Sequence, residues 1–359
     1  MLVLLAISLT CAALYFARDL FILLFTSGLF SFLMLPLCNK LERWKFPTWL
    51  AAMVCSLLVV VVLVAVGWFL AWEYSTFGAD LPELKAGLDE RFKDLQDYVR
   101  QEFNVNRRQQ EEWAEKQITT LTEEGGTIAM GLFSATGQVL AVLVVIPIFI
   151  FLLLLLRDKF RTFFSQLSED HSDAILKVVV NCADLSRRYL RGVLTVMVIL
   201  AVLNSIGFMV LGLKYAILLG VTAAMLNVVP YVGPLIGSIL PILIALITKD
   251  SAMYAAGALG VILITQFIDN NFITPKVVGS SVSINPLASI VALFAGGMLW
   301  GVLGLVLAIP ITGMLKVICD EVTGLKPYGF LLGEERTWPE EGLIDIPLLR
   351  KKRGKPKTT

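Results

Sequence analysis

The sequence predicts an all-α polytopic membrane protein. Hydrophobic residues make up 57% of the 359-residue chain, charged residues make up only 16%, and the mean hydropathy is +0.78. Soluble domains carry about 45–50% apolar and about 25% charged residues, so this balance is typical of a chain that lies largely in lipid. Apolar runs long enough to cross a bilayer, roughly 20 residues each, also recur along most of the chain.

About eight apolar segments are expected to be transmembrane helices, because hydrocarbon offers no water to exposed backbone N–H and C=O groups. These segments are 2–16, 20–37, 49–72, 139–156, 193–213, 215–247, 253–268 and 286–318. The first is interpreted as a retained span that forms a tight hairpin with the second. No Lys or Arg precedes it and no clear small-residue cleavage motif follows it, which argues against a signal peptide.

Basic residues gather in three places and set the expected orientation. They follow the second span, fill the segment after the fourth and close the C-terminus: Lys40, Arg43 and Lys45; Arg157, Lys159, Arg161, Lys177, Arg187, Arg188 and Arg191; Arg350, Lys351, Lys352, Arg353, Lys355 and Lys357. Under the positive-inside rule all three groups face the cytoplasm, so both termini are expected to be cytoplasmic.

The segment 73–138 carries 13 acidic against 7 basic residues and is expected to be an extracytoplasmic helical loop. Apolar residues recur there at three- and four-residue steps, which predicts one face of an amphipathic helix: Leu81, Leu84, Leu88, Phe92, Leu95 and Val99. A second helical stretch ends at Gly125 and Gly126. Either the pair packs on the membrane domain or on neighbouring subunits, or it forms a solvated cap without a partner.

Two polar segments are expected on the cytoplasmic side. Residues 157–191 form an amphipathic helix pair, with Phe160, Phe163, Phe164 and Leu167 on one side and basic residues on the other. Such a segment suits the inner membrane surface, so membrane anchoring is preferred over a ligand-controlled gate. The polar tail that begins at Gly324 is interpreted as a cytoplasmic extension.

Two apolar stretches are too long for one simple span and are interrupted. The stretch 215–247 breaks at Asn227-Val-Val-Pro230-Tyr231-Val-Gly233-Pro234-Leu-Ile-Gly237, and the stretch 286–318 breaks at Gly296, Gly297, Gly301, Gly304 and Pro310. Each is either a long broken helix or a re-entrant hairpin. Paired Gly/Pro-interrupted segments indicate the substrate site of a transporter, so we expect the two to face one another across the pathway.

Polar groups within or beside the apolar segments mark the expected pathway, because they are costly in hydrocarbon unless paired or wetted. Gln266, Asp269 and Asn270 end the seventh segment, shortly before Pro275. A carboxylate among amides suits a hydroxyl-rich solute, a cation or a proton. The alternative is that Asp269 and Asn270 terminate the helix at the interface and pair with Lys276.

Asn227 lies inside an apolar stretch beside the helix-breaking Pro230. In one interpretation its amide lines the expected site, together with the carbonyls that Pro230 and Pro234 leave without a donor. In the other, the amide donates to those carbonyls and keeps the break rigid. Tyr231 stacks on a solute or anchors packing, and Gly233 and Gly237 form a small-residue step that suits close helix packing. Asn204 and Asn285 are further polar candidates.

Catalytic and metal chemistry find little support in the sequence. The five cysteines lie in spans or cytoplasmic segments and imply no disulfide framework. His171 is the sole histidine, which excludes a two-histidine zinc motif. A Gly-x-Ser-x-Gly elbow and a Walker-type phosphate loop are both missing from the sequence. We therefore expect neither an enzyme nor a cofactor or metal, and transport that is passive or driven by an ion gradient.

The chain resembles the autoinducer-2 exporter family of bacterial permeases from about residue 4 to residue 316. Three motifs carry the resemblance: the run 227–237 already quoted, Asp269-Asn-Asn-Phe-Ile-Thr-Pro-Lys-Val-Val-Gly279, and Gly296-Gly-x-x-x-Gly-x-x-Gly-x-x-x-Ala-Ile-Pro310. The resemblance implies a multi-pass inner (plasma) membrane protein that exports small molecules. Some members carry the quorum-sensing signal autoinducer-2, others are similar to Na⁺(Li⁺)/H⁺ antiporters, and members form homo-oligomers, with a pentamer as one form.

We therefore expect a secondary transporter that exports a small polar solute by alternating access, with proton coupling through Asp269. A cation/proton antiporter on the same scaffold is the alternative, followed by a non-transporting membrane scaffold; nucleic acid is not an expected partner. The expected divisions are N-terminal transmembrane helices (1–72), the external loop (73–138), a transmembrane helix (139–156), the cytoplasmic amphipathic segment (157–191), the transport core (192–318) and the polar tail (319–359).

Overall fold

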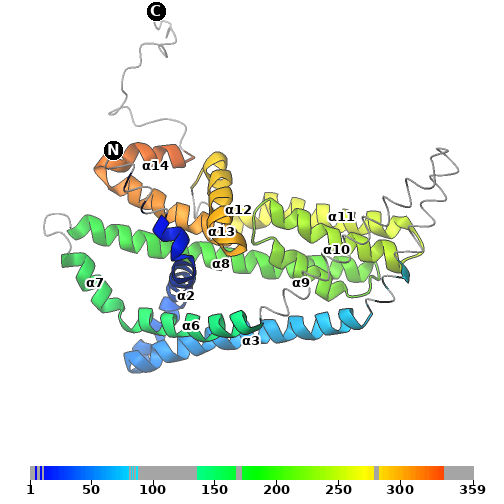
Figure 1. Ribbon diagram of the computed structural model, residues 1–359, viewed down its shortest axis with the longest axis horizontal. Coiled ribbons are helices and arrows are strands. Elements are labelled where there is room, and N and C mark those ends of the chain that lie inside the picture. Colours follow the sequence, from blue (N-terminus) through cyan, green and yellow to red (C-terminus); the bar gives the residue numbers. More distant parts are fainter. Residues whose placement is uncertain are drawn as a thin grey trace, which may run out of the picture.

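A computed structural model describes residues 5, 9, 12–80, 82, 84, 86, 87, 136–166, 172–278 and 283–334. The regular elements among these residues are all helical (Figure 1). They are α2 (Arg18–Arg43), α3 (Thr48–Ala79), α6 (Thr136–Leu155), α7 (Arg157–Gln166), α8 (Ser172–Val210), α9 (Ala216–Leu226), α10 (Val232–Thr248), α11 (Ala252–Ile268), a π-helix (Asp269–Ile273), α12 (Thr274–Val277), α13 (Pro286–Glu321), a 3₁₀ turn (Thr323–Leu325) and α14 (Lys326–Leu332).

The prediction of an all-helical membrane protein is confirmed. Five described helices are long and apolar enough to cross a membrane, namely α2, α3, the 175–210 part of α8, the run 252–277 and α13, and shorter apolar helices accompany them. The first expected span lies mostly outside the described residues, and so does most of the expected external loop. The expected amphipathic segment 157–191 comprises α7 and the first half of α8, which continues without a break to Val210.

Helices α2, α3 and α6 pack together through small residues. Ala51, Ala52 and Cys55 of α3 are fully buried against Ile150 and Leu154 of α6. Small side chains let helix backbones approach closely, which is the usual basis of helix association in lipid. Pro147 of α6 has no N–H and so leaves the carbonyl four residues earlier without its usual donor. The carbonyl of Pro147 itself accepts a 2.7 Å hydrogen bond from Ser56 of α3, which ties the two helices together.

Helix α8 is the axis of the second half of the molecule (Figure 1). Its 39 residues are about 58 Å long at 1.5 Å per residue, well beyond the roughly 30 Å of bilayer hydrocarbon. Helices α9 and α11 pack against its C-terminal half, and α10 packs on α9 and α11. Gly207 of α8 faces Val261 of α11, and Ser205 faces Gly220 of α9 so closely that neither glycine has room for a side chain.

The interrupted stretch 215–247 is a helical hairpin, here called the first hairpin. Gly233 at the start of α10 lies against the Leu226 carbonyl at the end of α9, and a Cβ at Gly237 would lie 3.2 Å from the Cα of Ala223. Moving forward along α10 thus means moving backward along α9, which is the pattern of two antiparallel helices. Residue 212, just before the hairpin, also lies near Lys249, just after it, so the hairpin enters and leaves at one end of α8.

The interrupted stretch 286–318 also turns back, and its two legs form the second hairpin. The chain reverses at Gly301, whose φ of 63° and ψ of −140° suit glycine alone, and the backbones of Gly296 and Gly304 touch across the legs. Helix α14 returns to the hairpin's beginning, where Asn285 caps α13 and donates to the carbonyls of Leu331 and Gly333. The sequence left the choice between broken helices and re-entrant hairpins open, and the structure has hairpins in both places.

The two hairpins are rooted at opposite ends of α8. Lys177 and Asn181, near the N-terminus of α8, contact Glu321 at the end of the second hairpin. Ser205, near the C-terminus of α8, packs on the first hairpin. The middle of α8 is therefore the place where both hairpins can contribute to one site.

Candidate functional site

An open cleft of about 610 Å³ lies beside the middle of α8. Four elements form its walls: α8, the tip of the first hairpin, the run from α11 to α12, and the legs of the second hairpin. Its lining residues are Tyr189, Val193, Val196, Met197, Ala224, Asn227, Val228, Pro230, Tyr231, Pro234, Gln266, Asp269, Asn270, Thr274, Val278, Ser289 and Ile309. Most of these side chains are apolar, with a few polar groups between them, as in small-molecule sites generally.

Asp269 is the polar centre of the cleft wall. Its side chain is buried, with 3% of the residue exposed, and among the described residues it is the single buried acid. Asn227 Nδ2 donates to Asp269 Oδ2 at 3.2 Å, and Thr274 Oγ1 donates to Asp269 Oδ1 at 2.7 Å. Neither donor is Lys276, the partner expected if Asp269 served only to end the helix at the interface.

The local backbone explains why Thr274 reaches Asp269. Residues Asp269–Ile273 form a π-helix, in which the Thr274 N–H bonds to the Asp269 carbonyl five residues earlier. Pro275 cannot donate to the carbonyl of Asn271 and its ring crowds that carbonyl, so the α-helix loosens just before it. Short π-segments inside helices are frequent at functional sites, and this one brings the Thr274 hydroxyl under the carboxylate.

The first hairpin presents a strained tip to the cleft. Asn227 ends α9, and Val232 N–H bonds to the Pro230 carbonyl at 2.8 Å across Tyr231. This is a γ-turn of the rare positive-φ form, because Tyr231 has φ 65° and ψ −52°. Such strain in a bulky residue persists only where the surroundings impose it, and it collects at binding sites and switches. The Tyr231 side chain itself is 64% exposed.

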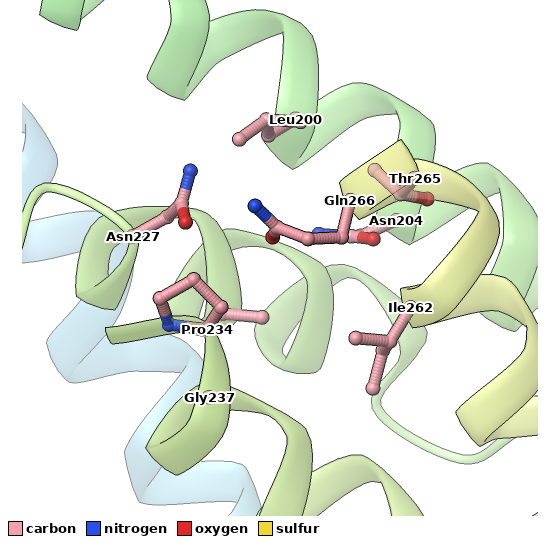
Figure 2. Close-up of a pocket in the computed structure, with 9 residues that line it drawn as sticks. Leu200, Asn204, Asn227, Pro234, Gly237, Ile262, Thr265 and Gln266 are labelled. Atoms are coloured by element: carbon pink, nitrogen blue, oxygen red, sulfur yellow. The ribbon is translucent and has the colours of Figure 1, made fainter. Parts of the chain in front are cut away.

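A second, small cavity of about 20 Å³ lies behind the cleft, between α8, the first hairpin and α11 (Figure 2). Asn204, Asn227, Thr265 and Gln266 supply its polar lining. Asn204 is 6% exposed, and its Oδ1 has no hydrogen-bond partner among the described residues. The volume suffices for one water molecule, which needs roughly 10–15 Å³. Gln266 Nε2 donates to Asn270 Oδ1 at 3.1 Å.

The structure brings together part of the expected pathway. Asn227, Pro230, Tyr231, Pro234, Gln266, Asp269 and Asn270 line the cleft, and Gly233 and Gly237 hold the first hairpin closed. Gly296, Gly297 and Gly301 shape the second hairpin instead, and Pro310 is buried within it. That hairpin reaches the cleft through Ser289 and Ile309, so both interrupted segments line the cleft, each through residues other than its glycines.

Some lining residues were not singled out from the sequence. Thr274 belongs to the motif 269–279. Pro275, which follows it, is the sequence feature that could have predicted the local π-helix and so the approach of the Thr274 hydroxyl to Asp269. Tyr189 lies in the basic segment expected at the membrane surface, and Ser289 and Ile309 carry no pattern of their own. Asn285, a polar candidate, caps α13 outside the cleft lining.

A separate polar cluster joins the two halves of the molecule, directly after α3. Lys214 Nζ lies 2.8 Å from Asp80 Oδ2, and the Tyr215 hydroxyl donates to the same carboxylate. The hydrogen bond from Lys214, followed by that from Tyr215, lowers the pKa of Asp80. Burial and the hydrogen bond to Asp80 raise the pKa of Tyr215. Among the described residues, no group of three or more His, Cys, Asp or Glu side chains is placed to hold a metal ion.

Comparison with known proteins gives a consistent picture. The sequence profile of the family described as AI-2E family transporter matches residues 3–324. The Bacillus subtilis (strain 168) protein YueF, named as a candidate transport protein, is 25% identical over 317 residues, which cover 84% of each chain. A Haemophilus influenzae protein of the same description is 25% identical over 315 residues, covering 83% of this chain and 86% of the relative. YrrI of B. subtilis, also so named, is 40% identical over 130 residues, 36% of each chain.

Proposed function

The chain belongs to the AI-2E transporter family, and from this premise we propose that it exports a small polar solute resembling autoinducer-2 through the cleft by alternating access coupled to protons. The observation that carries the proposal is the placement of Asp269. A buried carboxylate with two hydrogen-bond donors stands in the wall of a cleft that both hairpins reach. Ionisable groups inside membrane segments mark solute and proton pathways by default.

The chemistry of the cleft favours an uncharged, hydroxyl-bearing solute. Asn227, Gln266, Asn270 and Ser289 offer amides and a hydroxyl, which both donate and accept hydrogen bonds. Val193, Val196 and Met197 of α8 line the same cleft and suit the carbon skeleton of such a solute. Tyr231, exposed at the hairpin tip, supplies an aromatic face.

The Asn227–Asp269 hydrogen bond supports the proposal of proton coupling. An ionised carboxylate accepts hydrogen bonds only, whereas a protonated one also donates. Protonation of Asp269 therefore weakens its hold on the Asn227 amide and loosens the tip of the first hairpin. Because the tip is already strained at Tyr231, the hairpin is the element whose position the proton controls. Movement of that tip opens the cleft to one side of the membrane at a time.

The test is transport by the purified protein in liposomes loaded with autoinducer-2 and a pH-sensitive dye. We expect solute efflux with proton movement for the native chain, and loss of both for Asp269→Asn, which keeps the shape and removes the exchangeable proton. Asp320→Asn is the matched control, because Asp320 pairs with Lys316 on the surface, away from the cleft. Equal efflux from the native and Asp269→Asn proteins would refute the assignment of Asp269.

A Na⁺(Li⁺)/H⁺ antiporter is the second candidate, supported by the same buried acid among oxygen-bearing neighbours. An antiporter alternates one acidic site between a proton and a cation, and Asp269 with Thr274 and Asn227 supplies oxygens of the kind that hard cations prefer. The same liposomes distinguish the two candidates. Sodium-triggered proton flux that Asp269→Asn abolishes, without any solute efflux, would favour the antiporter.

A further inference from the structure

One end of the molecule carries exposed aromatic and basic side chains away from the cleft. The turn between α2 and α3 exposes Trp44 and Phe46, the start of α3 exposes Trp49, and α7 exposes Phe160 and Phe163. Trp44 is 63% and Phe163 is 55% exposed. Lys40, Arg43, Lys45, Lys159 and Arg161 are interleaved with these aromatics. We call these ten residues the basal surface.

Helix α7 has the charge pattern of a helix that lies in a membrane surface. With about 100° between successive residues, Phe160, Phe163 and Phe164 cover a sector of about 100°. Lys159 lies about 40° beyond one edge of this sector and Arg161 about 60° beyond the other. The uncharged or acidic polar residues occupy the opposite side: Asp158, Thr162, Ser165 and Gln166.

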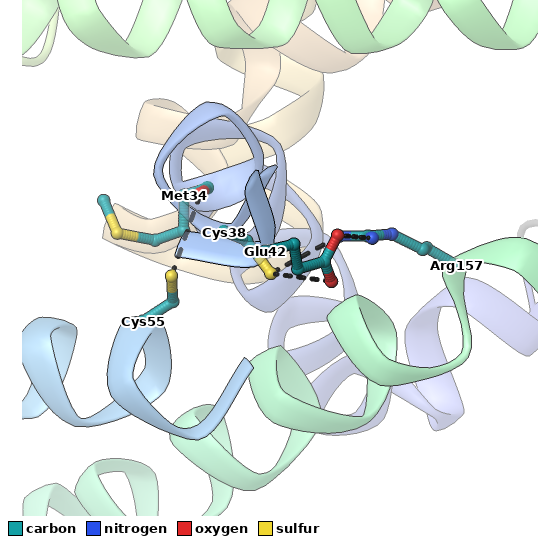
Figure 3. Close-up of polar contacts among 5 residues, drawn as sticks. All are labelled: Met34, Cys38, Glu42, Cys55 and Arg157. Atoms are coloured by element: carbon teal, nitrogen blue, oxygen red, sulfur yellow. Dashed lines mark hydrogen bonds and ion pairs between the residues drawn. The ribbon is translucent and has the colours of Figure 1, made fainter. Parts of the chain in front are cut away.

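An ion pair fixes α7 beside the turn between α2 and α3. Arg157, the first residue of α7, pairs with Glu42 in the last turn of α2, and its Nη1 also lies 3.4 Å from the sulfur of Cys38 (Figure 3). Trp44 follows Glu42 by two residues, and Lys40 lies over its ring at 5.2 Å. The start of α7 is therefore held level with the ends of the apolar helices α2 and α6.

We propose that α7 lies flat in the headgroup layer of the bilayer and that the basal surface binds anionic phospholipids. Phenylalanines on one side enter the boundary of the acyl chains, while Lys159 and Arg161 at the edges reach outward to phosphate groups. Tryptophan is favoured at this depth because its ring is apolar and its N–H is polar. Both Lys159 and Arg161 are exposed, and neither forms an ion pair with another described residue.

A lipid surface fits these residues better than a soluble phosphate or a second protein chain. Soluble phosphate would make no favourable contact with the exposed phenylalanines between the two cations. The basal surface also continues directly from apolar helices that already lie in lipid, since α7 begins two residues after α6 ends. The proposal depends on the membrane location of these helices and not on the cargo of the cleft.

The depth of α7 in the bilayer is tested with nitroxide labels in the full chain, with its native cysteines replaced. One label is attached at Phe163→Cys. The matched control, one residue away, is a label at Thr162→Cys. In bilayers containing phosphatidylglycerol, the label at residue 163 should collide with oxygen more than with a water-soluble nickel complex. The label at residue 162 should show the reverse. Equal access of the nickel complex to both labels would mean that α7 projects into water, and would overturn the proposal.

Lipid selectivity is tested by quenching of tryptophan fluorescence with brominated phosphatidylglycerol or brominated phosphatidylcholine. The native protein should prefer the anionic lipid, and Lys159→Gln with Arg161→Gln should reduce that preference about fivefold per residue. Arg188→Gln with Lys326→Gln, two basic residues outside the basal surface, should leave it unchanged. An unchanged preference in the first variant would refute the lipid site. Displacement of the lipid by millimolar inorganic phosphate, but not by sulfate at equal ionic strength, would assign the site to soluble phosphate instead.

Discussion

Asn204 keeps a polar atom buried without a partner among the described residues, which costs stability. Asn204 lines the small cavity behind the cleft, together with Gln266 and Asn227. A buried unpaired acceptor costs about 1–3 kcal/mol, and natural chains keep such groups mainly where function requires them. The residue therefore belongs with the polar wall of the proposed pathway rather than with the packing of α8.

We predict that Asn204→Leu raises the thermal unfolding temperature of the purified protein while it lowers transport. The substitution fills a similar volume and removes the unsatisfied oxygen, a gain of up to about 1–3 kcal/mol. Unfolding followed by light scattering and efflux from liposomes are the two measurements. A lower unfolding temperature would show that a water molecule or another group satisfies the oxygen, and unchanged transport would separate Asn204 from the pathway.

The asparagine-to-aspartate contact also shows how far single residues could be predicted. Asn227 and Asp269 were both selected from the sequence because each is polar within apolar surroundings. Their hydrogen bond spans 42 positions along the chain and joins the end of α9 to the end of α11. No local pattern encodes such a pairing, so the sequence predicted the members of the site and not their partners.

At the scale of elements, the glycines of the second hairpin set how closely its legs approach. A Cβ on Gly304 would collide with the backbone carbonyl of Gly296, and a Cβ on Gly296 would meet Gly304 in turn. Backbone atoms cannot rotate away as the end of a flexible side chain can. These two positions therefore admit no larger residue unless the legs separate.

We predict that Gly304→Ala lowers stability by at least about 1–3 kcal/mol, the usual range for overpacking. Gly260→Ala is the matched control, because Gly260 is also helical but has nothing within 4 Å of a new Cβ. Alanine is the better helix former there by about 1 kcal/mol, so this variant should be as stable as the native chain or more so. Thermal unfolding in detergent compares the two. Equal stability of both variants would contradict the close approach of the legs.

The hairpins also mark the limit of element prediction. Asn, Pro and Gly in the two long apolar stretches indicated interruptions at the right places. The reversal itself depends on contacts between α9 and α10, and between the legs of α13, that a one-dimensional pattern does not contain. Charge distribution offered no help, since a hairpin and a broken span at both sites leave the C-terminus on the same side.

At the scale of the whole molecule, the cluster of Asp80, Lys214 and Tyr215 links the α3 end of one half to the α8–α9 turn of the other. The pKa of Asp80 is lower in the folded protein than in the unfolded chain, chiefly because of the hydrogen bond from Lys214. Its stabilising contribution is therefore complete above the ordinary aspartate value of about 3.9 and disappears as the pH falls through the lower folded value.

We predict that the native protein unfolds at a higher temperature than Asp80→Asn at neutral pH, and that this difference shrinks toward zero below about pH 4. Tyr215→Phe removes one of the two donors and should narrow the same difference at neutral pH. Thermal scans of the three proteins across acidic and neutral pH measure this directly. A difference that stays constant with pH would mean that the charge of Asp80 does not join the two halves.

The placement of the bases of the two hairpins at opposite ends of α8 means that each hairpin can be restrained separately. An antibody fragment that binds the base of one hairpin can restrain only the wall of the cleft that this hairpin forms. Fragments selected separately against the two ends should therefore arrest different stages of the proposed transport cycle. Such a pair would provide the rigid particles that electron cryomicroscopy needs for each stage, with no substitution in the chain.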